Sequence, residues 1–365
     1  MNLSEILSQP KAIRHLKSML TTGRIPPAML FCGPAGCGKF PAAMAFAAAL
    51  NCTGIPHVPE QAKPKKNHSA APNDLFSMFG EAPEETEEPA SEPAVPEKII
   101  VPPGESCGKC LSCIQIEKGI HPDITVTGMN EQFEKTGKEA GSIKVDTMRE
   151  MLKKVYQRPL ISPHKVFIVK DAEKLMPEAQ NAILKTLEAP PEGTIIILLS
   201  ADKNALLPTI LSRAAEVNFQ PLSAETLKIL LEKEGITGQE ADFLSRSSQG
   251  SLDKARNIKL FAERASKLPP GEKTNAFRFV SMLSKDSHKA REEANAMLEL
   301  MVLRQREIWK DSPSAQNKYA TLIKNTLELR AMTNRNVSTS RILLAALLAS
   351  ENAGISLQDI LAINS

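Results

Sequence analysis

The sequence predicts an α/β domain followed by helical domains, and three observations lead to this fold class. Short apolar runs, such as residues 28–32 and 194–200, alternate with segments of helical periodicity up to residue 222. The first of these runs leads into a glycine-rich loop, GPAGCGKF, at residues 33–40. From Ser223 onward the apolar runs stop and helical patterns remain. Because strands that alternate with helices form a parallel sheet covered on both faces, we expect such a sheet in residues 1–222.

The size and charge of the chain limit its class. Its 365 residues give room for two or three domains, which we place at 1–222, 223–265 and 266–365. The net charge of +3 is too small to drive binding to nucleic acid through a global field, so such contacts would be local. The N-terminus lacks a signal-peptide core, and no apolar run approaches the roughly 20 residues of a membrane span. We therefore expect a soluble, cytoplasmic protein in a reducing compartment.

Residues 33–40 match a phosphate-binding loop except at the last position. Gly33, Gly38 and Lys39 fit the pattern GxxxxGK, whereas Phe40 replaces the serine or threonine whose hydroxyl ligates magnesium. An apolar strand precedes the loop and an alanine-rich helix follows it, which is the context that such a loop requires. The degenerate nucleotide site predicted from the sequence consists of Gly33, Gly36, Gly38, Lys39 and Asp171.

An insertion of different composition occupies about residues 54–103. Its stretch EAPEETEEPASEPAVPE has neither periodicity nor enough apolar residues to build a core. We therefore predict a disordered acidic segment. Within it, DLFSMFG at 74–80 is either a short docking motif or, as we favour, an incidental apolar patch.

All six cysteines lie in the first third of the chain, and four of them fit a metal site. CGKCLSC supplies Cys107, Cys110 and Cys113 on two CxxC steps, and Cys52 adds a fourth thiolate. Four thiolates are typical of structural zinc and leave no open position for catalysis. A thioredoxin-like CGKC pair is the alternative, which Cys113 and the lack of a preceding strand disfavour. The insertion is compatible with zinc, because closure entropy grows slowly with loop length.

The region after the cysteines continues the alternation of strands and helices. Strands are predicted at 123–128, 165–171 and 194–202, and helices at 144–159 and 177–190.

The end of the strand at 165–171 resembles the acidic strand end of an ATPase, with one position changed. Asp171 is in place to hold magnesium through water, but Ala172 stands where an active enzyme has a glutamate that orients water. Glu173 comes one residue late, and a one-residue slip on a strand turns the side chain to the opposite face. We therefore expect Lys170 and Glu173 to be solvated charges.

These motifs occur in the order found in the clamp-loader ATPase family. The phosphate loop, the CxxCxxC knuckle, HPDI, DAEKL, AQNAILKTLEAPPEGT, LLPTILSRA and NRNVSTSRILLAALL follow one another along nearly the whole chain outside the insertion. The chain is most similar to the delta-prime-type subunits of this family in bacterial DNA polymerase III. The resemblance implies a three-domain AAA+ protein, with an α/β nucleotide-binding module that carries a zinc knuckle at 52–113, a helical lid and a helical collar domain.

The same resemblance implies a role for Arg213, which lies on a loop just before an apolar strand. In the family, the arginine of a Ser-Arg-Cys motif reaches into the ATP site of the neighbouring subunit. Arg213 matches this arginine, while Ala214 replaces the cysteine. The alternative is a surface arginine that pairs with a nearby carboxylate such as Glu216.

Three ATPase elements are altered: Phe40, Ala172 and Asp253, the last in place of the second sensor arginine of active relatives. The resemblance then implies a stator that assembles with gamma/tau-type ATPase subunits and a delta-type subunit. It would help load the sliding clamp onto primed DNA without hydrolysing ATP, and DNA synthesis would belong to the polymerase complex. Zinc is the expected cofactor, and ATP or ADP would be held weakly by Lys39 and the loop amides.

Two other classes of function stay open. An active motor ATPase of gamma/tau type is disfavoured by Phe40 and Ala172. A free-standing zinc protein that recognises nucleic acid has little support, because one tryptophan and two tyrosines offer little stacking surface.

Overall fold

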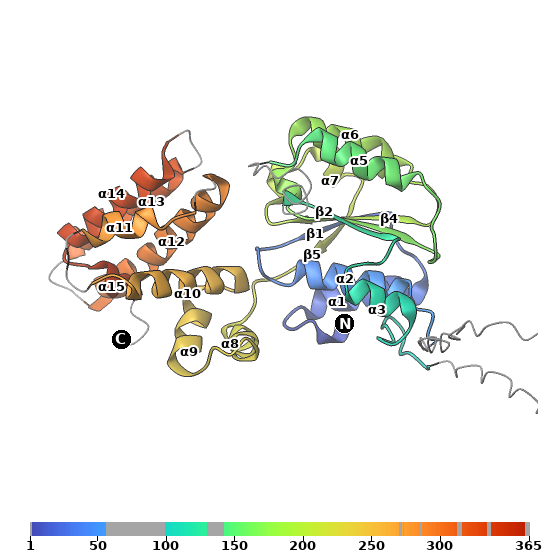
Figure 1. The fold of residues 1–365 in the computed structure, drawn as a ribbon, viewed down its shortest axis with the longest axis horizontal. Helices are drawn as coiled ribbons and strands as arrows, with labels where there is room; N and C mark the ends of the chain where they lie inside the picture. Colours follow the sequence, from blue (N-terminus) through green and yellow to red (C-terminus); the bar gives the residue numbers. More distant parts are fainter. Residues whose placement is uncertain are drawn as a thin grey trace, which may run out of the picture.

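The computed structural model describes residues 2–55, 99–129, 142–269, 272, 274–284, 287–311, 316–333 and 337–361. Most of the acidic insertion, including DLFSMFG at 74–80, lies outside these residues. The described part of the chain forms an α/β domain and a helical region beside it (Figure 1). None of the helices described is long and apolar enough to cross a membrane.

The α/β domain is built on a parallel five-stranded sheet in the order β2-β3-β4-β1-β5. All four residue runs predicted as strands up to 202 form strands, and the apolar run after Arg213 forms the fifth. The central strands are buried along their whole length, as expected for a sheet covered on both faces. The strands are β1 (Ala28–Cys32), β2 (Ile124–Thr127), β3 (Lys165–Val169), β4 (Thr194–Ser200) and β5 (Ala215–Asn218).

Helices cover the two faces of the sheet as separate layers (Figure 1). Side chains alternate along β1, so Met29 and Phe31 pack with α1 and α2, whereas Leu30 packs in the core on the opposite face. The first layer consists of α1 (Pro10–Thr22), α2 (Lys39–Leu50) and α3 (Leu111–Glu117), and the second of α5 (Val145–Val155), α6 (Pro177–Glu188) and α7 (Pro208–Leu211). The described residues also form three short 3-10 helices, η1 (Leu3–Glu5), η2 (Ala172–Lys174) and η3 (Lys203–Ala205).

The helical region shares one hydrophobic cluster that extends from Leu231 to Leu361. Helix α10 packs on α8 and α9 and also on α12 and α15. The division into a lid and a collar at 265/266 therefore stays a prediction, because α10 belongs to both packing groups. The helices are α8 (Ala224–Lys233), α9 (Gly238–Ser247), α10 (Leu252–Ser266), α11 (Asn275–Ser281), α12 (Ser287–Asp311), α13 (Gln316–Met332), α14 (Thr339–Asn352) and α15 (Leu357–Leu361).

The HPDI segment anchors the loop that precedes β3. The carboxylate of Asp123 accepts hydrogen bonds from the amides of Leu160, at 2.7 Å, and of Ile161 and Ser162, both at 2.9 Å. Burial opposes ionisation, but these three donors hold the pKa of Asp123 below its usual value.

The imidazole of His121 completes this anchor. Its Nδ1 accepts from the amide of Asp123 at 3.1 Å, so Nε2 carries the proton and donates to Ser162 Oγ at 3.0 Å. Burial lowers the pKa of His121, which is 3% exposed. Because the nitrogen next to Ser162 is protonated, this arrangement stabilises the loop and does not activate a nucleophile.

Candidate functional site

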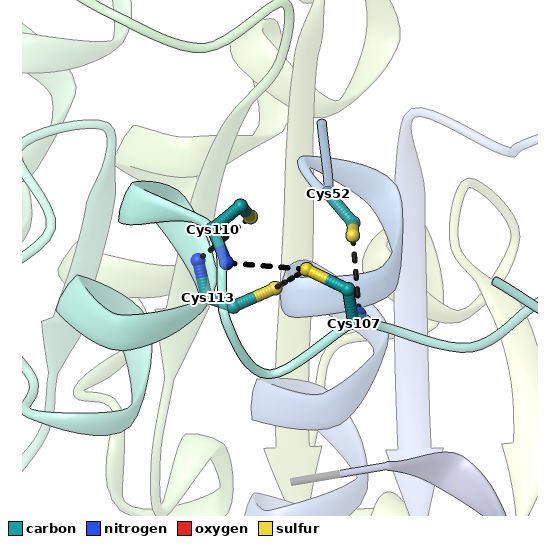
Figure 2. A group of neighbouring side chains, drawn as sticks. All are labelled: Cys52, Cys107, Cys110 and Cys113. Carbon is teal, nitrogen blue, oxygen red and sulfur yellow. Dashed lines mark hydrogen bonds between the residues drawn. The ribbon is translucent and has the colours of Figure 1, made fainter. Parts of the chain in front are cut away.

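The four cysteines of the predicted zinc knuckle come together beside α3 (Figure 2). Cys52 follows α2, Cys107 and Cys110 lie before α3, and Cys113 lies in its first turn. Their sulfur atoms all lie within 4.8 Å of one another, and Cys107 Sγ and Cys113 Sγ are 3.9 Å apart. A tetrahedral zinc with Zn–S bonds of about 2.3 Å places its sulfurs roughly 3.8 Å apart. The predicted four-cysteine cluster is confirmed, and it fits structural zinc.

Backbone amides around the knuckle support thiolate ligands. The amide of Cys107 donates to Cys52 Sγ at 3.2 Å, that of Cys110 to Cys107 Sγ at 3.2 Å, and that of Cys113 to Cys110 Sγ at 3.5 Å. Burial opposes ionisation of Cys110, but hydrogen bonds from Cys113 and Thr53 lower its pKa to about 6. A metal held here would close the base of the insertion, where the amide of Ile99 donates to the carbonyl of Gly54 at 2.7 Å.

The phosphate loop connects β1 to α2 in the geometry that the sequence predicts. Gly33 and Gly36 admit no side chain, because an added Cβ would lie 2.5 Å from the carbonyl oxygen of Phe219 and 2.6 Å from the amide nitrogen of Asp253. Gly36 and Gly38 also have positive φ angles of 67° and 97°, which favour glycine. The Lys39 ammonium donates to the loop's own carbonyls, those of Gly33 and Pro34, both at 2.6 Å.

Phe40 takes the position of the magnesium ligand and carries no oxygen. Its ring packs against the core of the α1 and α2 layer, and the Lys170 ammonium lies over it, 5.2 Å from the ring centroid. Asp171, the second residue expected near a metal, lies beside them in a left-handed conformation with φ 52°. The residues present therefore do not fit a magnesium ion held between a hydroxyl and a carboxylate.

The expectation for Glu173 is wrong, and the structure gives the reason. β3 ends at Val169 and η2 begins at Ala172, so the side-chain alternation of a strand does not apply to residues 172 and 173. Ala172 is fully buried in the core of the α5 and α6 layer. Glu173 lines the cavity with Lys170, and its carboxylate accepts a hydrogen bond from the amide of Ala201 at 3.1 Å. Glu173 and Lys170 thus both have contacts within the protein and are not charges in contact with solvent alone.

A cavity of about 530 Å³ adjoins the phosphate loop. It is closed on one side by the start of α10, where the amide of Leu252 donates to the carbonyl of Gly36 at 3.3 Å. Gly36, Gly38, Lys39 and Asp171 all line it, whereas Arg213 does not.

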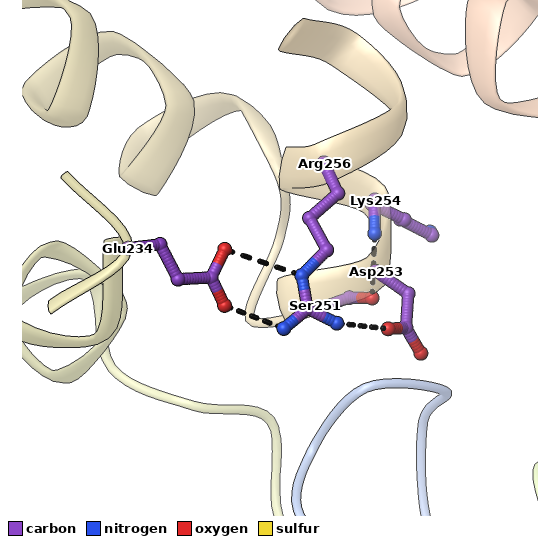
Figure 3. Close-up of polar contacts among 5 residues, drawn as sticks. All are labelled: Glu234, Ser251, Asp253, Lys254 and Arg256. Atoms are coloured by element: carbon purple, nitrogen blue, oxygen red, sulfur yellow. Dashed lines mark hydrogen bonds and ion pairs between the residues drawn. The ribbon is translucent and has the colours of Figure 1, made fainter. Parts of the chain in front are cut away.

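Arg256 is a charged residue of this cavity that the sequence did not single out. It lies one turn after Asp253 on α10, and its guanidinium pairs with Asp253 at 3.3 Å and with both oxygens of Glu234 (Figure 3). Asp253 and Arg256 are three residues apart on a helix, which places them on one face. That spacing could have identified Arg256, but the proximity of Glu234 depends on the packing of α8 against α10.

Arg213 lies on the loop between α7 and β5, away from the phosphate loop of its own chain. Its NH1 donates to the carbonyl of Thr209 at 3.0 Å and to Ser212 Oγ at 3.2 Å. Its Nε donates to Oε1 of Glu188 at 2.8 Å. The alternative expected from the sequence, a surface arginine paired with a nearby carboxylate, is present, but the carboxylate is that of Glu188. Glu216, the example named from the sequence, pairs with Lys203 at 2.9 Å.

Two buried glutamines that the sequence did not single out support these loops. Gln9 donates to the carbonyls of Cys37 and Gln220, and it ties the phosphate loop to the end of β5. Gln180 donates to the carbonyl of Ala205 at 3.2 Å and accepts from the amide of Leu207 at 2.8 Å, which fixes the approach to α7.

The sheet order, the phosphate loop after β1 and the helical region together define an AAA+-type P-loop fold. The family model described as "DNA polymerase III, delta subunit" matches residues 8–76 and 99–223. The chain therefore belongs to this family of DNA polymerase III clamp-loader subunits.

Curated proteins similar to this chain include DNA polymerase III subunits with other names. The chain is 28% identical to the DNA polymerase III subunit gamma/tau of Mycobacterium tuberculosis (strain CDC 1551 / Oshkosh), over 66% of this chain and 33% of that protein. It is 28% identical to DNA polymerase III subunit gamma of Buchnera aphidicola (subsp. Acyrthosiphon pisum), over 70% of this chain and 56% of that protein. It is 27% identical to DNA polymerase III subunit tau of Escherichia coli K12, over 70% of this chain and 32% of that protein. The chain thus spans from about a third to somewhat over half of the length of these relatives.

Solved structures with a similar chain path include two from Thermotoga maritima. The gamma subunit-related protein of DNA polymerase III aligns with a TM-score of 0.38 at 19% identity, over 64% of this chain and 88% of that one. The RuvB Holliday junction branch migration motor aligns with a TM-score of 0.41 at 12% identity, over 97% of this chain and 90% of that one.

Proposed function

We propose that this chain is a delta-prime-type clamp-loader subunit that does not hydrolyse ATP. In this proposal it assembles with gamma/tau-type ATPase subunits and a delta-type subunit in the cytoplasm. It contributes Arg213 to a neighbour's ATP site, and through the complex it acts on the sliding clamp and primer-template DNA. Its zinc is structural.

The absence of hydrolysis is supported by the geometry around Lys39. Phe40 offers no magnesium ligand, and Ala172 is buried in the core, where it orients no water. The position of the second sensor arginine is Asp253, whose carboxylate pairs with Arg256. Each change removes a different component of phosphoryl transfer, so restoring one of them leaves the others missing.

The role of Arg213 is supported by one observation in particular: the residue lies at the surface and does not line the cavity of its own chain. An arginine in that position has no phosphate of its own chain to contact. A neighbouring subunit docked on the α7–β5 loop would receive it, and a planar guanidinium suits the charge that develops on a transferred phosphoryl group.

The test is a complex reconstituted with its ATPase subunits. We expect Arg213→Ala to lower the DNA-stimulated ATPase by removing one active site, while zinc content and assembly stay intact. Arg213→Lys should rescue poorly, because an ammonium lacks the planar fork. Unchanged ATPase and clamp-loading rates in Arg213→Ala would contradict the proposal.

An active gamma/tau-type motor is the second candidate, favoured by the similarity to gamma/tau subunits. The isolated chain would then hydrolyse ATP at rates on the order of 1 per second or more. Steady-state turnover by the isolated chain separates the two candidates.

A further inference from the structure

Exposed apolar side chains gather at the edge of the sheet that lies away from the phosphate loop. This loop follows the C-terminal end of β1, so the segments that lead into β2 and β3 lie at the opposite edge of the parallel sheet. In the described part of the α/β domain, the large apolar side chains that are more than half exposed lie on those segments or at the base of the insertion. They are Ile100, Ile120, Tyr156, Leu160 and Ile161. Such a concentration of exposed apolar side chains is typical of an interaction surface.

The loop before β3 holds its apolar side chains on an ordered backbone. Three successive amides of this loop donate to the buried carboxylate of Asp123. The hydrogen bond between His121 and Ser162 joins the loop to the segment before β2, so Ile120 and Ile161 lie on adjoining segments. Because this backbone is already fixed, a ligand that docks on it loses little affinity to ordering of the loop.

Cations without partners border the same loop. A cavity of about 360 Å³ is lined by Leu160 together with Lys154, Arg158 and Lys165. The Lys165 ammonium is committed, because it donates to the carbonyls of Lys154 and Gln157 at 2.8 and 2.9 Å. In the described part of the chain, the side chains of Lys154 and Arg158 have no hydrogen-bond or ion-pair partner, and no acidic residue lines this cavity. The ligand that suits this surface carries both apolar and acidic side chains.

The acidic residues near these cations leave their charge in place. Asp123 is 1% exposed, and its carboxylate is occupied by the loop amides. Glu150 lies one turn before Lys154 on α5, and Glu192 lies before β4. Among the contacts of the described residues, neither glutamate forms an ion pair with Lys154 or Arg158. Positive charge and apolar surface are therefore exposed side by side.

We propose that residues 74–97 of this chain, which lie outside the described residues, dock on this surface. We call it the basal surface and define it by Ile120, Lys154, Arg158, Leu160 and Ile161. In this proposal the stretch DLFSMFG contacts the apolar side chains, and the acidic stretch after it pairs with the two cations. Seven glutamates and no basic residue lie between positions 81 and 97. The sequence alone favours an incidental apolar patch at 74–80, but the basal surface matches this patch in apolarity and its flank in charge.

The base of the insertion lies next to the basal surface. The amide of Ile99 donates to the carbonyl of Gly54, so the insertion leaves and rejoins the domain at one point. Asn51, three residues before Gly54, bonds both backbone groups of His164. Its Nδ2 donates to the carbonyl at 3.1 Å, and its Oδ1 accepts from the amide at 3.3 Å. His164 belongs to the loop that carries Leu160 and Ile161, so the tethered segment starts beside its docking surface.

The length of the insertion allows this contact and favours it. Residues 56–73 join the described chain to the start of the docking stretch, and an extended segment of roughly 20 residues spans up to about 60 Å. A tethered segment has an effective concentration on the order of 1 mM. A contact with a dissociation constant of about 0.1 mM would then be occupied about nine-tenths of the time. Even a weak contact is therefore sufficient.

Fluorescence anisotropy of a labelled peptide of residues 72–98 tests the proposal. The peptide is titrated with the zinc-loaded full chain and with a chain in which Gly-Ser repeats replace residues 74–97. We expect the peptide to bind the replaced chain, and to bind the unaltered chain about tenfold more weakly because the tethered segment competes. Phe76→Ser combined with Phe79→Ser in the full chain should release the segment and restore peptide binding. Zinc content and melting temperature verify that each chain is folded.

Variants of the basal surface, made in the replaced chain, locate the binding site. Lys154→Gln combined with Arg158→Gln should weaken peptide binding about tenfold, and so should Leu160→Ser. All three side chains are exposed, so these changes leave the core of the domain intact. Lys267→Gln combined with Lys318→Gln changes two exposed lysines of the helical region and is the matched control. It should bind the peptide as the replaced chain does.

Four results would overturn the inference. Absence of binding to the replaced chain at millimolar peptide would exclude the contact. Unchanged binding by both basal-surface variants would place it elsewhere. Equal affinity for the replaced and unaltered chains would leave the basal surface to a partner subunit. A dimer of the unaltered chain in sedimentation, lost in the replaced chain, would mean that the segment docks on a second copy. None of these results affects the role of Arg213, which is measured in the assembled complex.

Discussion

The guanidinium of Arg213 rests on the carboxylate of Glu188, with Nε 2.8 Å from Oε1, and this contact joins the α7–β5 loop to the C-terminal end of α6. The carbonyl of Thr209 holds another edge of the same guanidinium. The side chain is thus oriented before any partner binds. Because the side chains of Arg213 and Glu188 are 34% and 51% exposed, the ion pair contributes little to stability.

We therefore expect Glu188→Gln and Arg213→Ala to change the free energy of unfolding by less than about 1 kcal/mol. Both variants should nevertheless lower the ATPase of the assembled complex, Arg213→Ala because the guanidinium is lost and Glu188→Gln because its orientation is relaxed. Denaturant unfolding and complex ATPase are the two measurements. Lys203→Gln removes the neighbouring ion pair with Glu216 and serves as the matched control. An ATPase effect of Arg213→Ala without any effect of Glu188→Gln would show that Glu188 does not position the Arg213 guanidinium.

The isolated chain is expected to hydrolyse ATP no faster than background. Phe40→Thr alone should not rescue turnover, because Ala172 is buried in the core and cannot orient water. Phosphate release measured with and without primed DNA checks this. Rescue by Phe40→Thr alone would mean that another group, such as the nearby Glu173, orients the water.

The purified chain is expected to contain about one zinc, held by the four cysteines. Cys110→Ser should release it and destabilise the α/β domain, because ligand binding is coupled to folding. Elemental analysis and thermal melting are the measurements. Cys37→Ser changes a buried cysteine outside the cluster and should keep the metal. Freshly reduced protein without zinc would contradict the assignment.

The sequence predicts the sheet and the knuckle well because both have local signals. Apolar runs at 28–32 and 194–200 mark central strands, which are buried throughout. CxxC spacing places three sulfurs together through local geometry alone, and only Cys52 has to be brought in by the fold.

The charges around the phosphate loop could not be predicted as well. The strand expected at 165–171 ends at Val169, and the turn at Asp171 brings Glu173 into the cavity instead of turning it away. Arg256 reaches the same cavity because the first residue of α10, Leu252, donates a hydrogen bond to the carbonyl of Gly36 in the phosphate loop. These placements depend on tertiary contacts that a pattern of residue types does not encode.

The anchor of the loop before β3 leads to a prediction about pH. Burial lowers the pKa of His121, so the folded chain keeps this imidazole neutral, with Nδ1 as an acceptor. Unfolded histidine takes up a proton below about pH 6.5. The unfolded state therefore binds more protons as the pH falls through this value, and the free energy of unfolding decreases. Burial also lowers the pKa of His164, which contributes with the same sign.

We therefore expect the melting temperature to fall between pH 7 and pH 5.5, and to fall less in His121→Gln when each protein is compared with its own value at pH 7. Because His164 keeps its contribution, the dependence should be reduced and not abolished. His15→Gln, on the exposed face of α1, is the control and should follow the unaltered chain. At lower pH the melting temperature should fall again as Asp123 takes up a proton. Its folded pKa is lowered, so its stabilisation is present above the unfolded pKa and is lost as the pH falls through the folded pKa. A pH dependence in His121→Gln equal to that of the unaltered chain between pH 5.5 and 7 would mean that the imidazole of His121 titrates alike in the folded and unfolded states.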